Sequence, residues 1–290
     1  MEKIYVKARA KVNLCLSVLE KNKNGYHNLD SVFQKINFYD ELWLEKIKEN
    51  KLILESDIKG VKLEDNIIYK AYYKLIEEIG NFGGVKVKLK KNIPMQAGLA
   101  GGSTDCASFL IAINKLYNLN IEKVKLKEIA KSLGADVVPC MFNGAVLSSG
   151  IGDIIKKINT RFKYYFLIIK PKFSCNTAEM FKELDKIPKR KISRSKEIIN
   201  ALETNNFKLL SENLINDFEL VLEKKQEFIN IVKVIQNQGA KTLLAGSGSC
   251  VFGIFLEKQK AKEAYNNLKN KYEIYICTSY NLRRNYFGNE

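Results

Sequence analysis

Apolar and polar residues alternate along the first eighteen positions of the chain. Every even position from Ile4 to Val18 is apolar, whereas odd positions hold charged and polar residues such as Lys7, Lys11 and Asn13. This period of two predicts one half-buried β-strand, or two strands joined at a bend. Lys11 and Asn13 should therefore project from the same, polar side of the strand.

Similar patterns divide the rest of the chain into strands and helices. Alternation or short apolar runs predict strands at residues 31–47, 51–56, 85–91, 145–150, 162–169, 242–245, 249–257 and 272–279. Apolar residues at helical spacing predict helices at residues 66–79, 107–117, 125–133, 197–203, 207–215, 224–238 and 259–270. The charged segment 185–197 predicts a loop. This order of elements indicates an α+β protein with two sheet-and-helix layers that divide near residues 155–170.

Composition limits the chemistry that the chain can perform. Lysine and arginine number 48 against 32 aspartate and glutamate residues, a net charge of +16 that favours anionic partners such as nucleic acid, membranes or phosphorylated metabolites. A single histidine, His27, excludes zinc sites and proton relays that need two imidazoles. The six cysteines form no CxxC pair, and no apolar run has the length of a signal or membrane-spanning segment. Together these features predict reduced thiols and a cytoplasmic location.

The segment PMQAGLAGGSTD carries the strongest indication of function. It places Gly98, Gly101 and Gly102 between a predicted strand and a predicted helix, followed by Ser103 and Thr104. Glycine lets the backbone approach a phosphate closely, and a helix N-terminus attracts anions. The segment matches neither GxxxxGK[ST] nor GxGxxG. We interpret it as a phosphate-binding loop; the alternative is a flexible turn in which Ser103 only caps the helix.

Two further segments could contribute to the same site. The run AGSGSCVFG contains Gly246 and Ser247 between two apolar runs, and a second glycine-serine loop in one chain suggests a shared anion site. Asp136, in SLGADVVPC, either caps a short helix or accepts a proton from a substrate hydroxyl, as an aspartate does in kinases. Lys11 could stabilise the developing charge or keep that aspartate ionised, although by pattern alone it is no more special than Lys7.

These motifs resemble those of the GHMP kinase superfamily. The resemblance runs along nearly the whole chain, through KARAKVNLCLSV, GYHNLDSVFQKI, PMQAGLAGGSTDCA, LGADVVPC, SGIGD and AGSGSCVFGIF. The combination of AKVNL with GYHNL points to the branch that recognises cytidine. The resemblance implies a two-domain GHMP kinase fold with the active site in the cleft between the domains. Residues 1–157 would form a ribosomal-S5-domain-2-like ATP-binding domain, and residues 158–290 a ferredoxin-like α/β sandwich.

The resemblance also implies a reaction. The γ-phosphoryl group of ATP would pass to the 2-hydroxyl of 4-diphosphocytidyl-2-C-methyl-D-erythritol, in the non-mevalonate isoprenoid pathway. Mg²⁺ would accompany ATP, and Ser103 is the best candidate for a protein ligand. The implied partner is this small molecule, with no nucleic acid or membrane, and the protein would be a monomer or weak homodimer. The alternatives are another GHMP kinase, of mevalonate or homoserine type, and a basic nucleic-acid-binding protein.

Position in the matching motifs implies individual roles. Lys11 and Asp136 would be the catalytic pair. Tyr26 would stack on the cytosine ring, the His27 imidazole would hydrogen-bond to its edge, and Phe181 would cover its other face. The remaining substrate contacts would be Asn13, Gly246 and Ser247. The residues implied to contact ATP are Asn66, Pro94, Met95, Gln96, Ala97, Gly98, Leu99, Ala100, Gly101, Gly102, Ser103 and Thr104.

Overall fold

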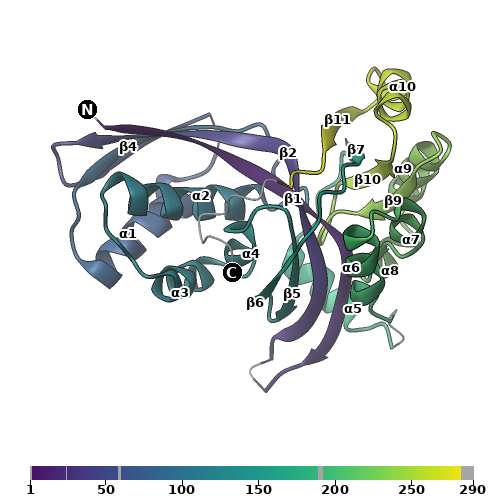
Figure 1. The fold of residues 1–290 in the computed structure, drawn as a ribbon, viewed down its shortest axis with the longest axis horizontal. Coiled ribbons are helices and arrows are strands. Elements are labelled where there is room, and N and C mark those ends of the chain that lie inside the picture. The colour runs from purple at the N-terminus through teal and green to yellow at the C-terminus, as the bar shows by residue number, and fades with distance from the viewer. Residues whose placement is uncertain (1, 24, 58–59, 189–191, 282–290) are drawn as a thin grey trace.

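The computed structural model of the chain describes residues 2–23, 25–57, 60–188 and 192–281, and these residues form two β-sheets with helices against them (Figure 1). The larger sheet contains β1 (Lys3–Lys21), β2 (His27–Ile47), β3 (Leu52–Ser56), β4 (Gly84–Lys90), β5 (Ala145–Gly150), β6 (Ile154–Ile158) and β8 (Ile215–Asn216). The smaller sheet contains β7 (Tyr165–Lys170), β9 (Lys241–Leu244), β10 (Val251–Phe255) and β11 (Glu273–Thr278).

The strand order shows how the two halves of the chain connect. The larger sheet has the order β3-β4-β2-β1-β8, with β5 paired to β2 and β6 to β5, and the smaller sheet has the order β11-β7-β10-β9. Strand β8 comes from the second half of the chain but pairs in parallel with β1. The second half therefore completes the larger sheet as well as forming the smaller one, and the division at residues 157 and 158 stays a prediction.

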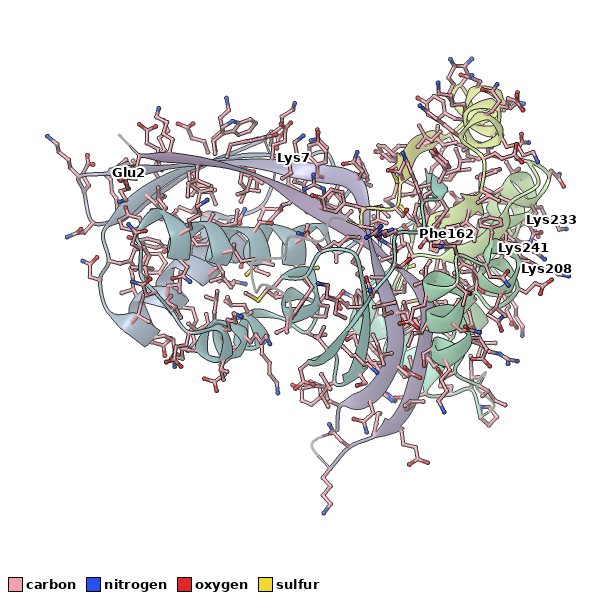
Figure 2. The ribbon with its side chains drawn as sticks, viewed as in Figure 1. Glu2, Lys7, Phe162, Lys208, Lys233 and Lys241 are labelled. Carbon is pink, nitrogen blue, oxygen red and sulfur yellow. The ribbon has the colours of Figure 1, made fainter. Side chains whose placement is uncertain are left out.

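Helices cover one face of the larger sheet and surround the smaller one (Figure 1). Those of the first half are α1 (Ile67–Ile79), α2 (Gly101–Leu116), α3 (Lys123–Leu133) and α4 (Val137–Cys140), with a 3₁₀ turn η1 (Leu63–Asp65). Those of the second half are α5 (Thr177–Leu184), α6 (Ser195–Glu203), α7 (Phe207–Glu212), α8 (Glu219–Leu222), α9 (Gln226–Gln236) and α10 (Lys258–Leu268). The helices of the first half leave the opposite sheet face open, and Lys7 projects from that open face (Figure 2).

Strand β1 takes part in all three clusters of buried apolar side chains. Ala8 belongs to the cluster between the larger sheet and α1–α3, and Val12 to a cluster that includes Phe166 and Phe252 of the smaller sheet. Leu16 and Val18 join a third cluster with side chains of α5, α9 and α10. Because burial of apolar surface is the main stabilising contribution to folding, this one strand joins the two halves of the protein.

The predicted half-burial of β1 is wrong for its central part. Lys11 and Asn13 are only 3% and 1% exposed, and Ser17 is completely buried. The prediction failed because the polar side of the strand is covered by other elements, which alternation within β1 cannot reveal. The strand is continuous but has register shifts against β2 between Arg9 and Lys11 and between Asn13 and Cys15. Such irregularities bend a strand and re-aim its side chains.

Other sequence predictions need smaller corrections. The helix expected at residues 207–215 ends at Glu212, because Ile215 and Asn216 instead pair with the free edge of β1. Helix α2 begins at Gly101 rather than at residue 107, so the last two glycines of the segment and Ser103 lie in its first turn. Three short elements, β6, α5 and α8, were not predicted, since so few residues carry little periodicity. The short helix α4 was expected only in the alternative in which Asp136 caps it.

The surface and the thiols agree with the composition. Lys208, Lys233 and Lys241 project outward from the second half of the chain (Figure 2), and all three are exposed. These three positive charges therefore lie on solvated surface. The six cysteines are free thiols, and only Cys175 is not fully buried. Within the described residues, no helix combines the length and the apolar character needed to cross a bilayer.

Candidate active site

Lys11 and Asp136, which are 125 positions apart in the sequence, meet in the folded chain. Lys11 Nζ lies 3.2 Å from Asp136 Oδ2, and the lysine side chain is 3% exposed whereas the carboxylate is 40% exposed. Asp136 stands at the N-cap position of α4, but its side chain makes no capping hydrogen bond. The N-cap alternative is therefore wrong, and the carboxylate is free to face a ligand on its exposed side.

A short chain of hydrogen bonds holds Lys11 in place. Lys11 Nζ donates to Asn13 Oδ1 at 2.8 Å, which confirms that these two side chains share one side of β1. Asn13 Nδ2 donates to Ser31 Oγ at 2.8 Å, and that hydroxyl donates to the carbonyl of Cys15 at 2.6 Å. Lys11 Nζ also lies 4.5 Å from the centre of the Phe33 ring. A buried ammonium group is stable only when its hydrogen bonds are made, and these partners leave it directed at Asp136.

The two glycine segments interlock. We call residues 94–100 the first glycine loop and residues 245–250 the second glycine loop. A Cβ atom at Gly98 would lie 1.7 Å from the Ala245 carbonyl oxygen, and one at Gly246 would lie 2.7 Å from the Gly98 carbonyl oxygen. Only glycine permits an approach this close. The sequence prediction that both segments contribute to one site is therefore geometrically possible.

The backbone of the first glycine loop has an unusual conformation. Gln96, Gly98 and Ala100 have positive φ angles of 51°, 75° and 56°. Backbone that alternates with left-handed residues forms concave nests of N–H groups that bind anions. The loop continues into α2 through Ala100, and no side chain caps this helix, so the capping role considered for Ser103 is wrong. Lys11 N donates to the Leu99 carbonyl at 3.2 Å, which places the loop beside the Lys11–Asp136 pair.

The residues predicted to contact ATP differ in what they expose. Ala97 and Leu99 are 3% and 1% exposed, so only their backbone could reach a ligand. The Thr104 hydroxyl is buried and donates to the Arg9 carbonyl at 2.6 Å. Asn66 caps α1 by accepting from Ile68 N at 2.9 Å. The residues of this group with partly or fully exposed positions are Asn66, Pro94, Met95, Gln96, Gly98, Ala100, Gly101, Gly102 and Ser103.

The residues predicted to hold cytosine gather at the turn between β1 and β2. Tyr26 is 66% exposed. His27 and Phe181 are stacked on one another, with ring centres 5.4 Å apart and an angle of 11° between the planes. His27 Nδ1 lies 2.9 Å from the Leu19 carbonyl and Nε2 lies 2.9 Å from Asp185 Oδ1. Both imidazole nitrogens therefore face protein atoms here, and the predicted hydrogen bond to a base edge stays a prediction.

Helix α5 connects this turn to the glycine loops. At its start, the Thr177 hydroxyl lies 2.8 Å from the Ser247 hydroxyl. Just past its end, Asp185 lies 2.5 Å from Lys21 Nζ as well as facing His27. Eight helical residues span about 12 Å, so the two predicted subsites are one short helix apart.

A second, sealed cluster of charges lies at the base of the first glycine loop. Lys91 Nζ contacts both Asp40 Oδ2 and Asp105 Oδ2, the latter at 2.6 Å, and the two carboxylates are 0% and 2% exposed. Asp40 Oδ1 also accepts from the backbone N–H groups of Asn92 and Ile93 at 2.6 and 2.8 Å. This cluster therefore closes the base of the loop, because it ties the segment before the loop to Asp105 in α2.

Burial dominates the electrostatics of this cluster. Burial holds the pKa of Asp105 well above its ordinary value. The charge of Asp40 raises this pKa further, whereas Lys91 lowers it. Burial alone would lower the pKa of Lys91, but Asp105 and Asp40 together raise it. Two carboxylates share one lysine, so the cluster favours one retained proton. No sequence pattern singled out these residues, although the place of Asp105 directly after Thr104 was an available signal.

Among the described residues, no group of three or more histidine, cysteine, aspartate or glutamate side chains could bind a metal ion. A Mg²⁺ site does not require such a group, because this ion commonly binds through one or two protein oxygens, substrate phosphates and water. Ser103 lies partly exposed in the first turn of α2. Its hydroxyl therefore fits the predicted role of an oxygen ligand.

Comparison with known proteins identifies the family. Residues 66–144 match the family described as GHMP kinases N terminal domain, and residues 195–274 match GHMP kinases C terminal. A protein of Caldicellulosiruptor saccharolyticus, named 4-diphosphocytidyl-2-C-methyl-D-erythritol kinase, is 36% identical over 290 residues, which are 99% of this chain and 100% of that protein.

Solved structures agree with this assignment. A crystal structure of 4-(cytidine 5'-diphospho)-2C-methyl-D-erythritol kinase matches with a TM-score of 0.81 and 26% identity, over 95% of this chain and 98% of that chain. The homoserine kinase of Cytophaga hutchinsonii matches over 96% and 95% with a TM-score of 0.74, and at 19% identity it shares only the fold. The predicted fold is thus confirmed, and the chain belongs to the GHMP kinases, a family of small-molecule kinases that use ATP.

Proposed function

We propose that this chain transfers the γ-phosphoryl group of ATP to the 2-hydroxyl of 4-diphosphocytidyl-2-C-methyl-D-erythritol, giving the 2-phosphate and ADP. The observation that carries the proposal is the pairing of a half-exposed Asp136 with a buried Lys11 beside two interlocked glycine loops. The names of relatives that match the chain over nearly its full length support the choice of substrate.

In this proposal Asp136 is the general base. Its exposed carboxylate accepts the proton of the 2-hydroxyl while that oxygen bonds to the γ-phosphorus and the bond to the β-phosphate oxygen breaks. Lys11, at 3.2 Å, holds the carboxylate in place through an ion pair and balances the negative charge of the phosphates. Asn13 holds the ammonium group in that position. ADP leaves, and the proton remains on Asp136 until it passes to solvent.

ATP would bind at the first glycine loop. The left-handed residues Gln96, Gly98 and Ala100 would direct backbone N–H groups toward the phosphates, and α2 would add the positive end of its dipole there. Ser103 would contribute an oxygen to Mg²⁺, which when bound to ATP offsets charge on the phosphates. The second glycine loop, through Gly246 and Ser247, would close the site from the second half of the chain.

The cytidine group would lie near Tyr26, one helix away from the reacting atoms. The exposed ring of Tyr26 offers a face on which a base can stack. Phe181 supports this site from α5, where it packs on His27. The imidazole, whose nitrogens face Leu19 and Asp185, would fix the shape of the turn until substrate binds. The cleft between the two domains would thus hold both substrates.

An assay of ADP release with Mg-ATP tests the proposal. Three alcohols are compared: 4-diphosphocytidyl-2-C-methyl-D-erythritol, mevalonate and homoserine. We expect turnover of the first alone. Turnover of mevalonate or homoserine without turnover of the cytidine compound would replace this function with that of another GHMP kinase.

A further inference from the structure

A second buried lysine, besides Lys11, lies behind the proposed phosphate site. Lys35, on β2, is 5% exposed. Its Nζ donates to the Arg9 carbonyl at 2.7 Å and to the Thr104 hydroxyl at 2.9 Å, and it also hydrogen-bonds to the Cys140 thiol. These contacts join β2 to the strand that carries Lys11, to the first turn of α2 and to the short helix that follows Asp136.

Lys35 differs from Lys11 and Lys91 in its lack of a carboxylate partner. Lys11 has Asp136, and Lys91 has Asp40 and Asp105. In the part of the chain that the structure describes, Lys35 makes no ion pair. Burial accordingly lowers its pKa. A buried cation without an anion lowers the stability of the folded protein, so its presence here calls for an explanation.

The position of Thr104 indicates where an anion would come from. Thr104 follows Ser103 in the first turn of α2, where the first glycine loop ends. In the proposed function the ATP phosphates occupy this loop. A charge buried in the protein interior interacts with a nearby anion more strongly than a charge in water does. The nucleotide would therefore supply the missing negative charge.

We propose that Lys35 is a positioning residue for ATP. Its hydrogen bond to Thr104 fixes the start of α2, and the phosphates of the bound nucleotide balance its charge. This inference rests on the proposed binding of ATP at the first glycine loop. The competing explanation is purely structural, in which Lys35 only ties β1, β2 and α2 together. The two explanations differ in their effects on the free protein and on nucleotide binding.

The test replaces Lys35 with methionine, which keeps the length of the side chain and removes its charge. The Arg9 carbonyl still accepts from the Thr104 hydroxyl, so this variant leaves no backbone oxygen unpaired. We expect the Kd for ADP and for ATP, measured by isothermal titration calorimetry, to rise about tenfold. The KM for the alcohol substrate should not change. The free variant should unfold at the same temperature as the unmodified protein or at a higher one, because an unbalanced charge is gone.

Two further variants complete the experiment. Lys88→Met removes the same charge from an exposed position on β4 and should leave nucleotide affinity unchanged. Lys35→Gln keeps a hydrogen-bond donor without the charge, and it replaces the methionine variant if that protein does not fold. We expect it to weaken nucleotide binding in the same way.

Some outcomes would overturn the inference. Unchanged nucleotide affinity with a lower unfolding temperature would show a purely structural role. An equal loss of affinity in Lys88→Met would show that only the overall field of the protein matters. If the unmodified protein binds neither ADP nor ATP, the proposed function itself fails, and the inference fails with it.

Discussion

Two clusters of lysine and aspartate flank the first glycine loop, and they differ in how they meet solvent. In one, a buried Lys11 faces a single carboxylate, Asp136, that is 40% exposed. In the other, Lys91 faces two carboxylates, Asp40 and Asp105, that are 0% and 2% exposed. The residue types are the same, and both clusters bring together parts of the chain that are distant in sequence.

This difference distinguishes a carboxylate that can react with a substrate from carboxylates that stabilise the loop. An aspartate that is open to solvent on one side can exchange a proton with a substrate, whereas a sealed one cannot be reached. The sealed cluster instead accepts backbone N–H groups of Asn92 and Ile93 and so fixes one end of the loop. Exposure of the carboxylate, and not the presence of a lysine–aspartate pair, is therefore what marks the candidate base.

Breaking the open cluster should give the largest change in activity. Asp136→Ala removes the proposed base and should lower kcat by roughly 10²–10⁴-fold, with little change in ATP affinity. Steady-state kinetics and nucleotide titration measure both quantities. Glu55→Ala, which removes an exposed carboxylate paired with Lys86, serves as the control. An unchanged kcat in Asp136→Ala would exclude this residue from the mechanism.

Breaking the sealed cluster should instead reduce stability. Lys91→Met leaves two buried carboxylates without a cation and should lower the free energy of unfolding by about 3–5 kcal/mol. Denaturant titration measures this loss. The neighbouring Lys90, which is 56% exposed and pairs with Glu41 at 3.2 Å, provides a matched control. Lys90→Met should cost no more than about 1 kcal/mol, and equal losses in the two variants would contradict the comparison.

A smaller effect is expected at the turn that carries Tyr26, away from both clusters. Tyr26→Ala removes a stacking surface for cytosine and should raise the KM for the cytidine substrate about tenfold. The affinity for ATP should stay the same. Tyr5→Ala, at a 45% exposed position on the open sheet face, should change neither quantity. A parallel loss of ATP affinity in Tyr26→Ala would contradict the placement of this residue.

The smallest effect concerns the pH dependence of stability. The folded protein raises the pKa of Asp105 above its ordinary value of 3.8, so the folded state binds this proton more tightly than the unfolded state does. The contribution of Asp105 to stability is therefore greatest at low pH. It falls as the pH rises above 3.8 through the raised pKa, by at most about 1.4 kcal/mol per pH unit.

Asp105→Asn should remove that slope. Denaturant titrations at a series of pH values should show the variant gaining stability relative to the unmodified protein as the pH rises. A stability difference that does not change with pH would show that Asp105 titrates alike in the folded and unfolded chain.

Local pattern predicted much of the site. Alternation along β1 placed Lys11 and Asn13 on one side, and a hydrogen bond of 2.8 Å confirms it. The glycine-rich segment was expected between a strand and a helix, and it lies between β4 and α2. These predictions succeeded because side-chain direction and turn formation depend on residues close together in the sequence.

Other features had no local signal. Lys91 directly follows β4, whose Lys88 and Lys90 are exposed, so the sequence does not distinguish it from them. No local pattern marked Lys35 on β2 either. The N-cap and base hypotheses for Asp136 were equally compatible with its flanking residues. Strand β8 was not predicted, because Ile215 lies at the end of a helical pattern. The strand forms only by pairing with β1, which lies some 200 positions earlier in the chain.

By itself, the sequence determined most strands and helices of this protein, its two glycine loops and its resemblance to GHMP kinases. The tertiary structure alone decided which charges meet, which carboxylate stays open and which lysine lacks an anion. The physical reason is that the energy of a charge depends on its burial and on the distance to its partners. In this fold the partners of a charge, such as Lys11 and Asp136, come from segments far apart along the chain, as do the two glycine loops that meet at Gly98 and Gly246.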